Sequence, residues 1–383
     1  MPKRVYLIAG EPSGDLLGGR LMAALRRQCP EVEFFGVGGE LMQENGLKSL
    51  FPISDISVMG FFEVLPRLRL ILRRIRQTVA DIKRTQPDVV VTIDSWGFVA
   101  SVLKKLKKEG VTIPKIHYVA PQVWVWKKGR AKTMPQLVSH LMTLLPFEPQ
   151  LFEKHGLPCT FVGHPVIENT ANVANDSAAF RAQHSIPPNK EILCVLPGSR
   201  HSELRHIAPI LVDALKIFVE KHPNIHLVIP TVEAVAGEVR ALFEQLPTPH
   251  TIVHGQQARY SAFTAARMAM AASGTVSLEL TACGTPHLVA YTFSRLSNFF
   301  AYMLVKIKWF NLINILSQRG IIPEFIGDDC RTAPIAAKAL EMWESPLLLQ
   351  QQVADAQQAL AKLKPHNMLP SEAAAKVVMA VAN

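Results

Sequence analysis

Two glycine-containing loops in the second half of the chain combine residue types that can bind phosphate. One has the sequence LPGSR and the other SGTVSLE, and each follows a short apolar run. Backbone N–H groups at a helix start and a guanidinium suit a diphosphate, and a carboxylate one turn into the helix suits a ribose diol. A surface turn explains either loop alone, but the pair predicts a site for a nucleoside diphosphate. The candidate ligands are Gly198, Ser199, Arg200, Ser273, Gly274, Thr275 and Glu279.

The loop GEPSGD at residues 10–15 gathers polar groups at the end of the first apolar run. It has neither the G-x-G-x-x-G pattern of a dinucleotide loop nor the G-K-[ST] ending of a P-loop, which argues against NAD at this position. Capping of the following helix by Ser13 or Asp15 explains part of the pattern. Two glycines, a hydroxyl and two carboxylates exceed what a cap needs. The loop therefore also predicts a ligand-binding edge, with Glu11, Ser13, Gly14 and Asp15 as candidates.

Asp94 is the candidate general base. It ends the strongly apolar run VVVTID, and a carboxylate at the end of a buried strand lies at the sheet edge and is partly desolvated. The alternative is that Asp94 caps a helix beginning at Ser95. His117 and His164 also attract attention, but a histidine in an apolar strand context is more typical of a core position.

The elements that would position these residues are short apolar runs alternating with helix-sized segments, which is typical of βαβ units with a parallel sheet. A polar, alanine-rich stretch at residues 169–190 separates two such series and predicts a linker. We therefore expect an α/β protein with two doubly wound, Rossmann-like halves, followed by two helices, the second with Ser371 as its N-cap. The expected strands are 5–10, 32–38, 89–94, 115–119, 141–146 and 160–163, then 192–197, 225–230, 250–254, 268–273 and 286–291.

The composition narrows the class of protein and partner. The chain has 383 residues and a formal net charge of +10, which calls for a negative partner: nucleic acid, anionic lipid or a phosphorylated substrate. No aromatic-rich basic stripe or recognition motif supports nucleic acid. Five scattered cysteines without C-x-x-C spacing predict a reducing compartment and neither disulfides nor a zinc site. No run of 18 apolar residues is uninterrupted, so we expect no membrane span.

The segment after residue 58 predicts contact with lipid. A helix from Pro66 would place Leu68, Ile71, Leu72, Ile75, Val79 and Ile82 on one face and five arginines on the other. Such a helix either covers the sheet or lies on anionic lipid, and the sequence leaves both open. Met59, Phe61 and Phe62 are the candidates for contact with acyl chains. A second interfacial patch is predicted from Phe299, Phe300, Trp309 and Phe310 with Lys306 and Lys308.

In combination these motifs resemble the lipid A disaccharide synthases, glycosyltransferases of the GT-B fold. The chain departs from the family pattern at Pro12, where alanine is usual, and at Ile313-Asn314-Ile315, where Pro-Asn-Leu is usual. The resemblance spans nearly the whole chain. It rests on GEPSGD (10–15), VMGFFEVLPRL (58–68), PDVVVTID (87–94), IHYVAPQVWVW (116–126), LPFE (145–148), VGHP (162–165), LPGSR (196–200), SGTVSLE (273–279) and NLINILSQRGIIPEFI (311–326).

The resemblance implies transfer of 2,3-diacylglucosamine from its UDP donor to the 6-hydroxyl of 2,3-diacylglucosamine 1-phosphate (lipid X), with inversion and release of UDP. The implied donor domain is residues 169–365, and the implied acceptor and membrane-facing domain is residues 1–168 with a returning helix at about 366–383. The implied catalytic residues are Asp94, Asp15, Arg200 and Asn314, and the implied acceptor or lipid contacts include Glu11, Ser13, Gly14, Met59, Phe61, Phe62, Arg319 and Glu324.

No cofactor and no metal is expected, since the chain has no D-x-D motif. The resemblance implies a peripheral protein on the cytoplasmic face of the inner membrane, and it admits a homodimer. The alternative is another UDP-sugar enzyme of the same fold, such as a UDP-N-acetylglucosamine 2-epimerase, which would not call for the basic, apolar segment 58–76. A purely lipid-binding module would leave the glycine loops and Asp94 unexplained.

Overall fold

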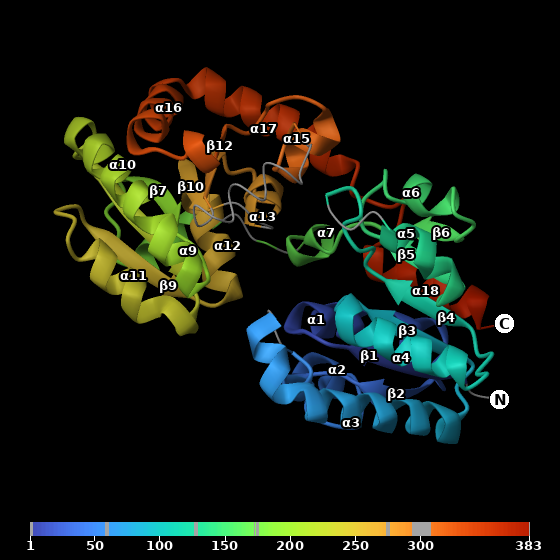
Figure 1. Ribbon diagram of the computed structural model, residues 1–383. Helices are drawn as coiled ribbons and strands as arrows, with labels where there is room; N and C mark the ends of the chain where they lie inside the picture. Colours follow the sequence, from blue (N-terminus) through green and yellow to red (C-terminus); the bar gives the residue numbers. More distant parts are fainter. Residues whose placement is uncertain are drawn as a thin grey trace. The chain divides into compact units, whose positions relative to one another are not determined.

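The chain forms two compact units, which we describe separately. The computed structural model describes residues 3–57, 61–125, 129–171, 173, 176–272, 276–292 and 308–382, with the backbone alone for residues 61–66. Unit 1 comprises Met1–Pro165 and Leu363–Asn383, and unit 2 comprises Val166–Lys362 (Figure 1). Each unit contains a six-stranded parallel sheet with helices on both faces.

The sheet of unit 1 has the strand order β2-β1-β3-β4-β5-β6. Its first strand lies inside the sheet, so the chain runs outward from β1 in one direction to β2 and in the other to β3. The strands are β1 (Arg4–Ala9), β2 (Glu33–Val37), β3 (Val89–Ile93), β4 (Lys115–Tyr118), β5 (His140–Thr143) and β6 (Cys159–Phe161). The helices are α1 (Pro12–Gln28), α2 (Glu40–Glu44), α3 (Phe61–Thr85), α4 (Trp96–Lys108), α5 (Gly129–Thr133), α6 (Pro149–Glu153) and α18 (Pro370–Val381), with single turns η1 (Ile53–Asp55) and η2 (Met134–Gln136).

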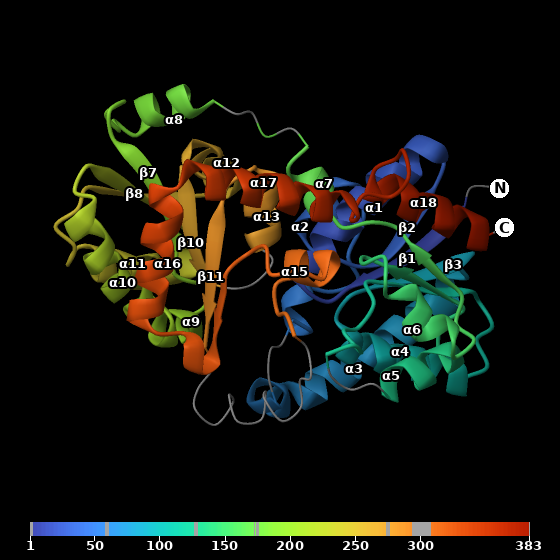
Figure 2. The ribbon, with the colours of Figure 1, turned by 90° about the horizontal axis from the view of Figure 1, so that it is seen from above.

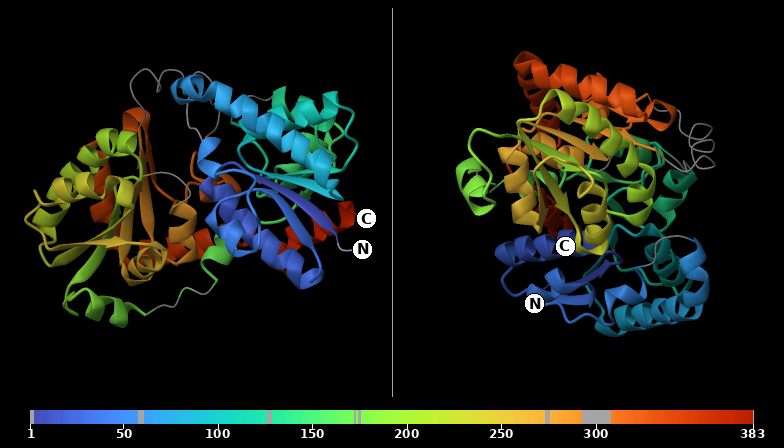
Figure 3. Two further views of the ribbon diagram at one scale, coloured as in Figure 1. Left: turned by 90° about the horizontal axis from the view of Figure 1, so that it is seen from below. Right: turned by 90° about the vertical axis from the view of Figure 1, so that its left-hand side faces the viewer.

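Alternating residues of the buried strands supply the cores on the two faces of the unit 1 sheet. In β1, Val5 and Leu7 pack with α1 and α18, whereas Tyr6 and Ile8 pack with α3 and α4. This period of two is the side-chain geometry of any strand, and burial of both faces explains why the strands are continuously apolar. The C-terminal helix α18 lies along α1 (Figure 2), and α3 and α4 cover the opposite face (Figure 3).

The sheet of unit 2 has the order β12-β11-β10-β7-β8-β9, again with its first strand inside. Helices α10, α11 and α16 cover one face, and α8, α12 and α13 cover the other. The strands are β7 (Glu191–Leu196), β8 (Ile225–Thr231), β9 (His250–His254), β10 (Met268–Ala272), β11 (His287–Tyr291) and β12 (Glu324–Ile326). The helices are α7 (Val166–Asn169), α8 (Ser177–Gln183), α9 (His201–His206), α10 (Ala208–Lys221), α11 (Ala236–Phe243), α12 (Gln256–Ala265), α13 (Val276–Ala282), α15 (Leu312–Ser317), α16 (Thr332–Glu344) and α17 (Pro346–Ala361), with single turns η3 (Glu233–Val235) and η4 (Gly327–Asp329).

The α/β architecture agrees with the prediction, and four local features differ. The N-cap residue of the last helix, α18, is Leu369 and not Ser371, which lies inside the helix. Strand β12 was not predicted, because Pro323 and Glu324 interrupt the apolar run around it. Helix α8 lies inside the stretch expected to be a linker: Asp176 caps it through the Ala179 N–H, and Phe180 is buried in the core. Helix α3 begins at Phe61, so Pro66 stands in its second turn and not at its start. None of the described helices is both long and apolar enough to span a membrane.

Candidate functional site

The loops after β1 and β3 meet at the carboxyl edge of the unit 1 sheet. The two strands are parallel neighbours at the point where the strand order reverses, which is where ligands bind in open α/β sheets. Ser13 Oγ donates to Asp94 Oδ2 over 3.4 Å. A Cβ atom on Gly10 would lie 2.5 Å from Ser95 Oγ, so only glycine fits at that position. The structure therefore brings the GEPSGD loop and Asp94 together, as the sequence predicts.

The backbone at this edge is held in sparsely populated conformations. Asp94, Ser95 and Val119 have φ angles of 51°, 43° and 83°, in the left-handed region that non-glycine residues rarely adopt. Hydrogen bonds from the Asp94 N–H to the Tyr118 carbonyl (2.9 Å) and from the Val119 N–H to the Met142 carbonyl (3.0 Å) hold two of them. Ser95 is the N-cap residue of α4, and no side chain caps that helix. Clustered strain of this kind is typical of functional sites.

Asp15 lies in the same loop but has a structural environment. Its buried carboxylate accepts hydrogen bonds from the backbone N–H groups of Gly39 (2.7 Å), Leu41 (3.0 Å) and Met42 (3.2 Å). These N–H groups have no partner within α2 because they lie at its start, so Asp15, which belongs to α1, caps the neighbouring helix α2. This differs from the expected catalytic role and from the capping of its own helix. The described contacts commit both oxygens of the carboxylate to the backbone.

Glu11 and Gly14 complete the loop. Glu11 is the half-buried N-cap residue of α1 and makes no capping hydrogen bond through its side chain. Gly14 is buried, and a Cβ atom there would lie 3.3 Å from the carbonyl oxygen of Ile93. The glycine thus lets α1 pack closely on the end of β3.

Glu148 is a buried carboxylate at the same edge that the sequence patterns do not single out. It follows β5, accepts from the Leu145 N–H (3.0 Å) and from Trp124 Nε1 (3.4 Å), and so ties the loop after β4 to the loop after β5. Burial raises the pKa of this carboxyl to about 7. The signal that could have found it resembles the one that found Asp94, since Glu148 is the first carboxylate after a buried strand and lies within LPFE.

His117 and His164 are core residues, as predicted. Burial lowers the pKa of His117 to about 3 and that of His164 to about 4. His117 Nδ1 lies 2.8 Å from Thr92 Oγ1 inside the sheet. A histidine held neutral in this way is a packing residue with one polar partner and not a proton carrier.

Unit 2 contains a pocket of about 830 Å³ at the carboxyl ends of β7, β8, β9 and β10. It too lies where the strand order reverses, between β7 and β10. Four of the predicted nucleotide ligands line it, whereas Ser273, Gly274 and Thr275 lie outside the described residues. The lining residues are Leu196, Gly198, Ser199, Arg200, Glu203, Pro230, Thr231, Val232, Glu233, His254, Gly255, Gln256, Arg259, Ala272, Val276 and Glu279.

Glu203 holds the LPGSR loop in place through hydrogen bonds. Its carboxylate accepts from the Ser199 N–H (2.8 Å) and from Arg200 Nη1 (3.0 Å), while Gly198, with a φ of 130°, leaves room for the Glu203 side chain. The Arg200 side chain remains 62% exposed. The sequence patterns do not single out Glu203, although its spacing of one helical turn from Arg200 is a usable signal.

Glu279 lies on the opposite side of the reversal point, in the first turn of α13. Burial raises the pKa of its carboxyl, and the Arg259 guanidinium beside it opposes this shift. Arg259 Nη2 donates to Glu279 Oε1 over 3.0 Å, and the Tyr260 hydroxyl donates to the same oxygen over 3.1 Å. Both donors come from α12, and nothing in their spacing from Glu279 marks them in the sequence. The pocket can therefore present a guanidinium, backbone N–H groups and a fixed carboxylate to one ligand.

Comparison with known proteins decides the family. Residues 5–378 match the family described as Lipid-A-disaccharide synthetase. The chain is 46% identical over 378 residues to the lipid-A-disaccharide synthase of Paramagnetospirillum magneticum, covering 98% of this chain and 96% of that protein. It is 42% identical over 381 residues to that of Rhodospirillum centenum, covering 99% and 95%. The chain belongs to the lipid-A-disaccharide synthase family. It is a UDP-sugar-dependent glycosyltransferase of lipid A biosynthesis, and the family match does not favour the epimerase alternative.

Solved structures at low identity show the fold. The Neisseria meningitidis UDP-GlcNAc 2-epimerase bound to UDP-GlcNAc aligns with a TM-score of 0.62 at 13% identity, covering 99% of each chain. Acinetobacter baumannii MurG aligns with a TM-score of 0.59 at 13% identity, covering 99% of this chain and 100% of that one. The predicted GT-B fold is thereby confirmed.

Asn314, carried over from the family pattern, is fully buried in unit 2. Its amide donates to the Ile322 carbonyl (2.7 Å) and to Glu324 Oε1 (2.5 Å), and its Oδ1 accepts from the Ile322 N–H (2.9 Å). Glu324 Oε2 in turn accepts from the Phe310 N–H (2.8 Å). These two residues thus hold the 310–324 segment of the synthase together, and the described side chain of Asn314 does not line the pocket.

Arg319 is exposed and pairs with Asp355 on α17 over 3.2 Å. The two residues form a surface ion pair, which contributes little to stability. Arg319 does not line the described pocket, and its expected contact with acceptor or lipid stays a prediction.

Helix α3 of the synthase exposes residues that the sequence pattern places on its buried face. Leu68 and Leu72 are 47% and 44% exposed, whereas Ile75, Val79 and Ile82 are buried, so this part of α3 covers the sheet, which is one of the two arrangements that the sequence leaves open. Ile71 packs partly against the core and Ile75 is the first of these residues to be buried in it, so the periodic face continues past the surface that it covers. Exposed arginines surround them: Arg67, Arg69, Arg73 and Arg76.

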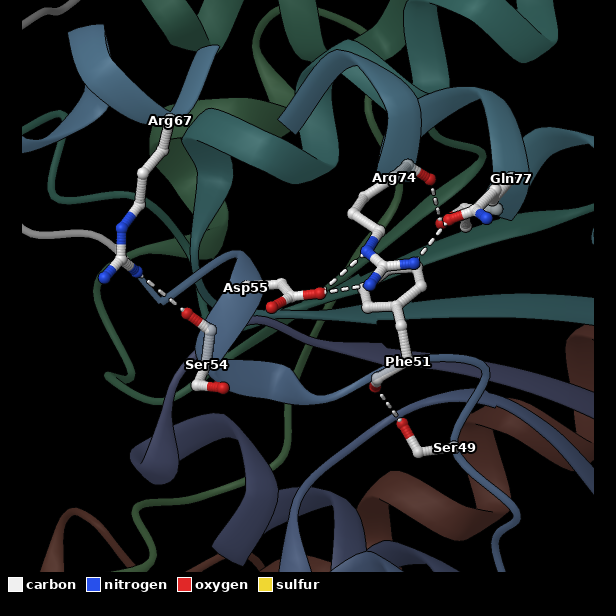
Figure 4. A network of polar contacts seen from close by, with 8 residues as sticks. Ser49, Phe51, Ser54, Asp55, Arg67, Arg74 and Gln77 are labelled. Atoms are coloured by element: carbon white, nitrogen blue, oxygen red, sulfur yellow. Dashed lines mark hydrogen bonds and ion pairs between the residues drawn. The ribbon is translucent and has the colours of Figure 1, made fainter. Parts of the chain in front are cut away.

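Arg74 anchors α3 to the segment before it (Figure 4). Its guanidinium donates to Asp55 and lies 4.7 Å from the centre of the Phe51 ring. Arg67 donates to the Ser54 carbonyl over 3.2 Å. Arg74 thus fixes α3 to the preceding segment, whereas Arg67, Arg69, Arg73 and Arg76 are exposed.

Several predicted lipid contacts lie beyond what the structure describes. Met59, Phe299, Phe300 and Lys306 fall outside the described residues, and the side chains of Phe61 and Phe62 are likewise not described. Of the second predicted patch, Trp309 packs on Gly320, where a Cβ atom would lie 2.7 Å from its ring.

Proposed function

We propose that this protein transfers 2,3-diacylglucosamine from UDP-2,3-diacylglucosamine to the 6-hydroxyl of lipid X, with inversion, giving the β-1,6-linked disaccharide 1-phosphate and UDP. The observation that carries the proposal is the match of residues 5–378 to the lipid-A-disaccharide synthetase family. The pocket of unit 2 and the polar edge of unit 1 supply the groups that such a transfer needs.

UDP binds in the unit 2 pocket in this proposal. Its volume of about 830 Å³ suits a nucleotide sugar. Arg200, with its exposed guanidinium, and the backbone N–H of Gly198 receive the diphosphate, and Glu279 accepts hydrogen bonds from the ribose. As the bond from C1 to the diphosphate oxygen breaks, the electron pair goes to the diphosphate, and Arg200 stabilises that charge.

Asp94 acts as the general base. The acceptor 6-hydroxyl loses its proton to the carboxylate while its oxygen attacks C1 from the face opposite the leaving UDP. Ser13, which donates to Asp94 Oδ2, orients the carboxylate. Among the described residues Asp94 has no cationic partner that would weaken it as a base.

Contact with the cytoplasmic face of the inner membrane is assigned to the outward face of α3. Two exposed leucines amid exposed arginines combine apolar area with attraction to anionic headgroups. Both substrates carry acyl chains, so binding at the lipid surface brings the enzyme to them. No helix of the described chain spans the bilayer, and the proposal requires none.

The direct test is incubation with UDP-2,3-diacylglucosamine and lipid X, followed by detection of disaccharide 1-phosphate and UDP in equal amounts. Absence of both products would refute the proposed transfer. A parallel reaction with UDP-N-acetylglucosamine alone tests the epimerase alternative, which predicts formation of the C2 epimer.

Flotation with vesicles tests the membrane assignment separately. We expect binding to vesicles that contain anionic phospholipid and loss of binding in Leu68→Asp/Leu72→Asp. Gln77→Asp, at an exposed position on the same helix, is the matched control. Equal flotation of the two variants would rule out this face as the contact.

A further inference from the structure

Glu279 has two carboxylate oxygens in different situations. Oε1 accepts both protein donors, Arg259 Nη2 at 3.0 Å and the Tyr260 hydroxyl at 3.1 Å. No described residue donates to Oε2. The side chain is only 12% exposed and lines the pocket. A carboxylate that is this desolvated is stabilised by its pairing and hydrogen bonds at Oε1, and Oε2 is the oxygen with which we expect it to accept from a ligand.

The two donors are themselves held in place before any ligand arrives. Tyr260 is buried, packs edge-on against Phe263 with ring centres 6.1 Å apart, and receives a hydrogen bond from Gln256 (3.4 Å). The Arg259 guanidinium lies 5.2 Å from the centre of the Tyr260 ring. Both residues belong to α12, which follows β9, whereas Glu279 belongs to α13, which follows β10. The orientation of the carboxylate is therefore set by an element other than its own.

We propose that Arg259 and Tyr260 are positioning residues that aim Glu279 Oε2 at the ribose diol and so make the pocket selective for ribonucleotides over 2′-deoxyribonucleotides. The inference rests on the proposed binding of UDP and adds to it the origin of sugar selectivity. A polar group built to receive a hydroxyl rejects the analogue that lacks it, because the buried acceptor is then left unpaired. A carboxylate that is free to rotate can find another hydrogen-bond partner when the ligand lacks this hydroxyl, whereas a carboxylate held by two protein donors cannot.

Arg259 also determines whether Glu279 is ionised. Burial raises the pKa of the Glu279 carboxyl, and the Arg259 charge opposes that shift. The groups that face the carboxylate are Arg259 and Tyr260 from α12 and Cys283 from α13, and burial raises the pKa of that thiol to about 12. Without the guanidinium, Glu279 takes up a proton at a higher pH than in the native protein, so ribose binding weakens sooner as the pH falls.

The test is titration calorimetry of the full chain with UDP and with 2′-deoxy-UDP. We expect the native protein to bind UDP at least tenfold more tightly. Arg259→Met should reduce that ratio to about twofold and make UDP binding weaken more steeply as the pH falls, Tyr260→Phe should reduce the ratio less, and Arg259→Lys should restore part of it. Arg240→Met, at an exposed position on α11 outside the pocket, is the control.

The possible results separate this inference from the proposed function. Native protein that does not bind UDP refutes the donor assignment. Native protein that binds UDP and 2′-deoxy-UDP equally, or an Arg259→Met variant that keeps the native ratio, refutes the positioning role while UDP binding stands. If Arg259→Met does not fold, Tyr260→Phe and Arg259→Lys decide the question, since an unchanged ratio in both overturns it.

Discussion

The carboxyl edges of the two sheets have the same topology, but the carboxylates at these edges have different partners. In each unit the first strand lies inside a parallel sheet, and polar residues gather where the strand order reverses. In unit 2 two of the carboxylates that line the pocket are paired with arginines, Glu203 with Arg200 and Glu279 with Arg259. In unit 1 Asp94 meets the hydroxyl of Ser13, and Asp15 meets backbone N–H groups.

This difference between the partners of the carboxylates suits the proposed roles of the two units, ligand binding in unit 2 and proton transfer in unit 1. A guanidinium beside a carboxylate stabilises its ionised form, which makes it a fixed acceptor and a weaker base. A carboxylate whose partner is a hydroxyl retains the ability to take a proton. The same topology can therefore provide a nucleotide pocket in one unit and a proton acceptor in the other, because the loops and not the sheet determine the partners.

The largest expected effect is that of Asp94→Asn. It removes the proposed proton acceptor while keeping shape, so kcat should fall by about 10²- to 10⁴-fold with little change in the KM for the UDP donor. Steady-state kinetics on the purified variant would measure this. Full turnover would eliminate Asp94 as the base and break the proposed division between the units.

The next effect concerns Glu148 and pH. Its folded-state pKa of about 7 lies above the unfolded value, so the folded protein binds an extra proton between about pH 4.5 and 7 and loses stability as the pH rises through that window. At 1.36 kcal/mol per pKa unit, the loss approaches about 3 kcal/mol. Thermal unfolding of the native protein and Glu148→Gln at pH 5 and pH 8 should show the variant gaining relative stability at pH 8. A constant difference across the two pH values would contradict this.

A smaller effect is expected from Asp15→Asn. The amide keeps one acceptor oxygen and turns a donor toward the N–H groups at the start of α2, which should cost about 1–3 kcal/mol of unfolding free energy. Urea unfolding measures the loss, and kcat per folded enzyme should stay near the native value. A variant with native stability but low kcat would show that Asp15 has a catalytic role and not a structural one.

The smallest effect is expected from Arg200→Gln in unit 2. Loss of one exposed guanidinium should weaken UDP binding about tenfold and leave uridine binding unchanged, because uridine carries no phosphate. Calorimetry with both ligands, with Arg240→Gln as the control, would measure this. Equal weakening for UDP and uridine would show that Arg200 supports the pocket and does not bind the diphosphate.

Local sequence patterns predict most of the fold and part of the candidate site. Alternating apolar runs and helix-sized segments predict both sheets, and the ends of the runs predict Asp94, Arg200 and Glu279 as edge residues. Strand β12 could not be found in this way because Pro323 and Glu324 interrupt its apolar run. The exposure of Leu68 and Leu72 could not be found either, since a helical period shows which residues share a face but not where the covered surface ends.

The sequence by itself determined the class of fold, the edge positions of the polar loops and the basic, amphipathic character of α3, because each depends on residues close together in the chain. Only the tertiary structure decided which partner each carboxylate has. Asp15 is bound by the start of α2 and Glu279 by Arg259, across separations of more than 20 and of 20 residues respectively. The physical reason is that packing of neighbouring strands brings together loops with no local relation, and the identity of the partner decides whether a carboxylate supports the backbone, binds a ligand or accepts a proton.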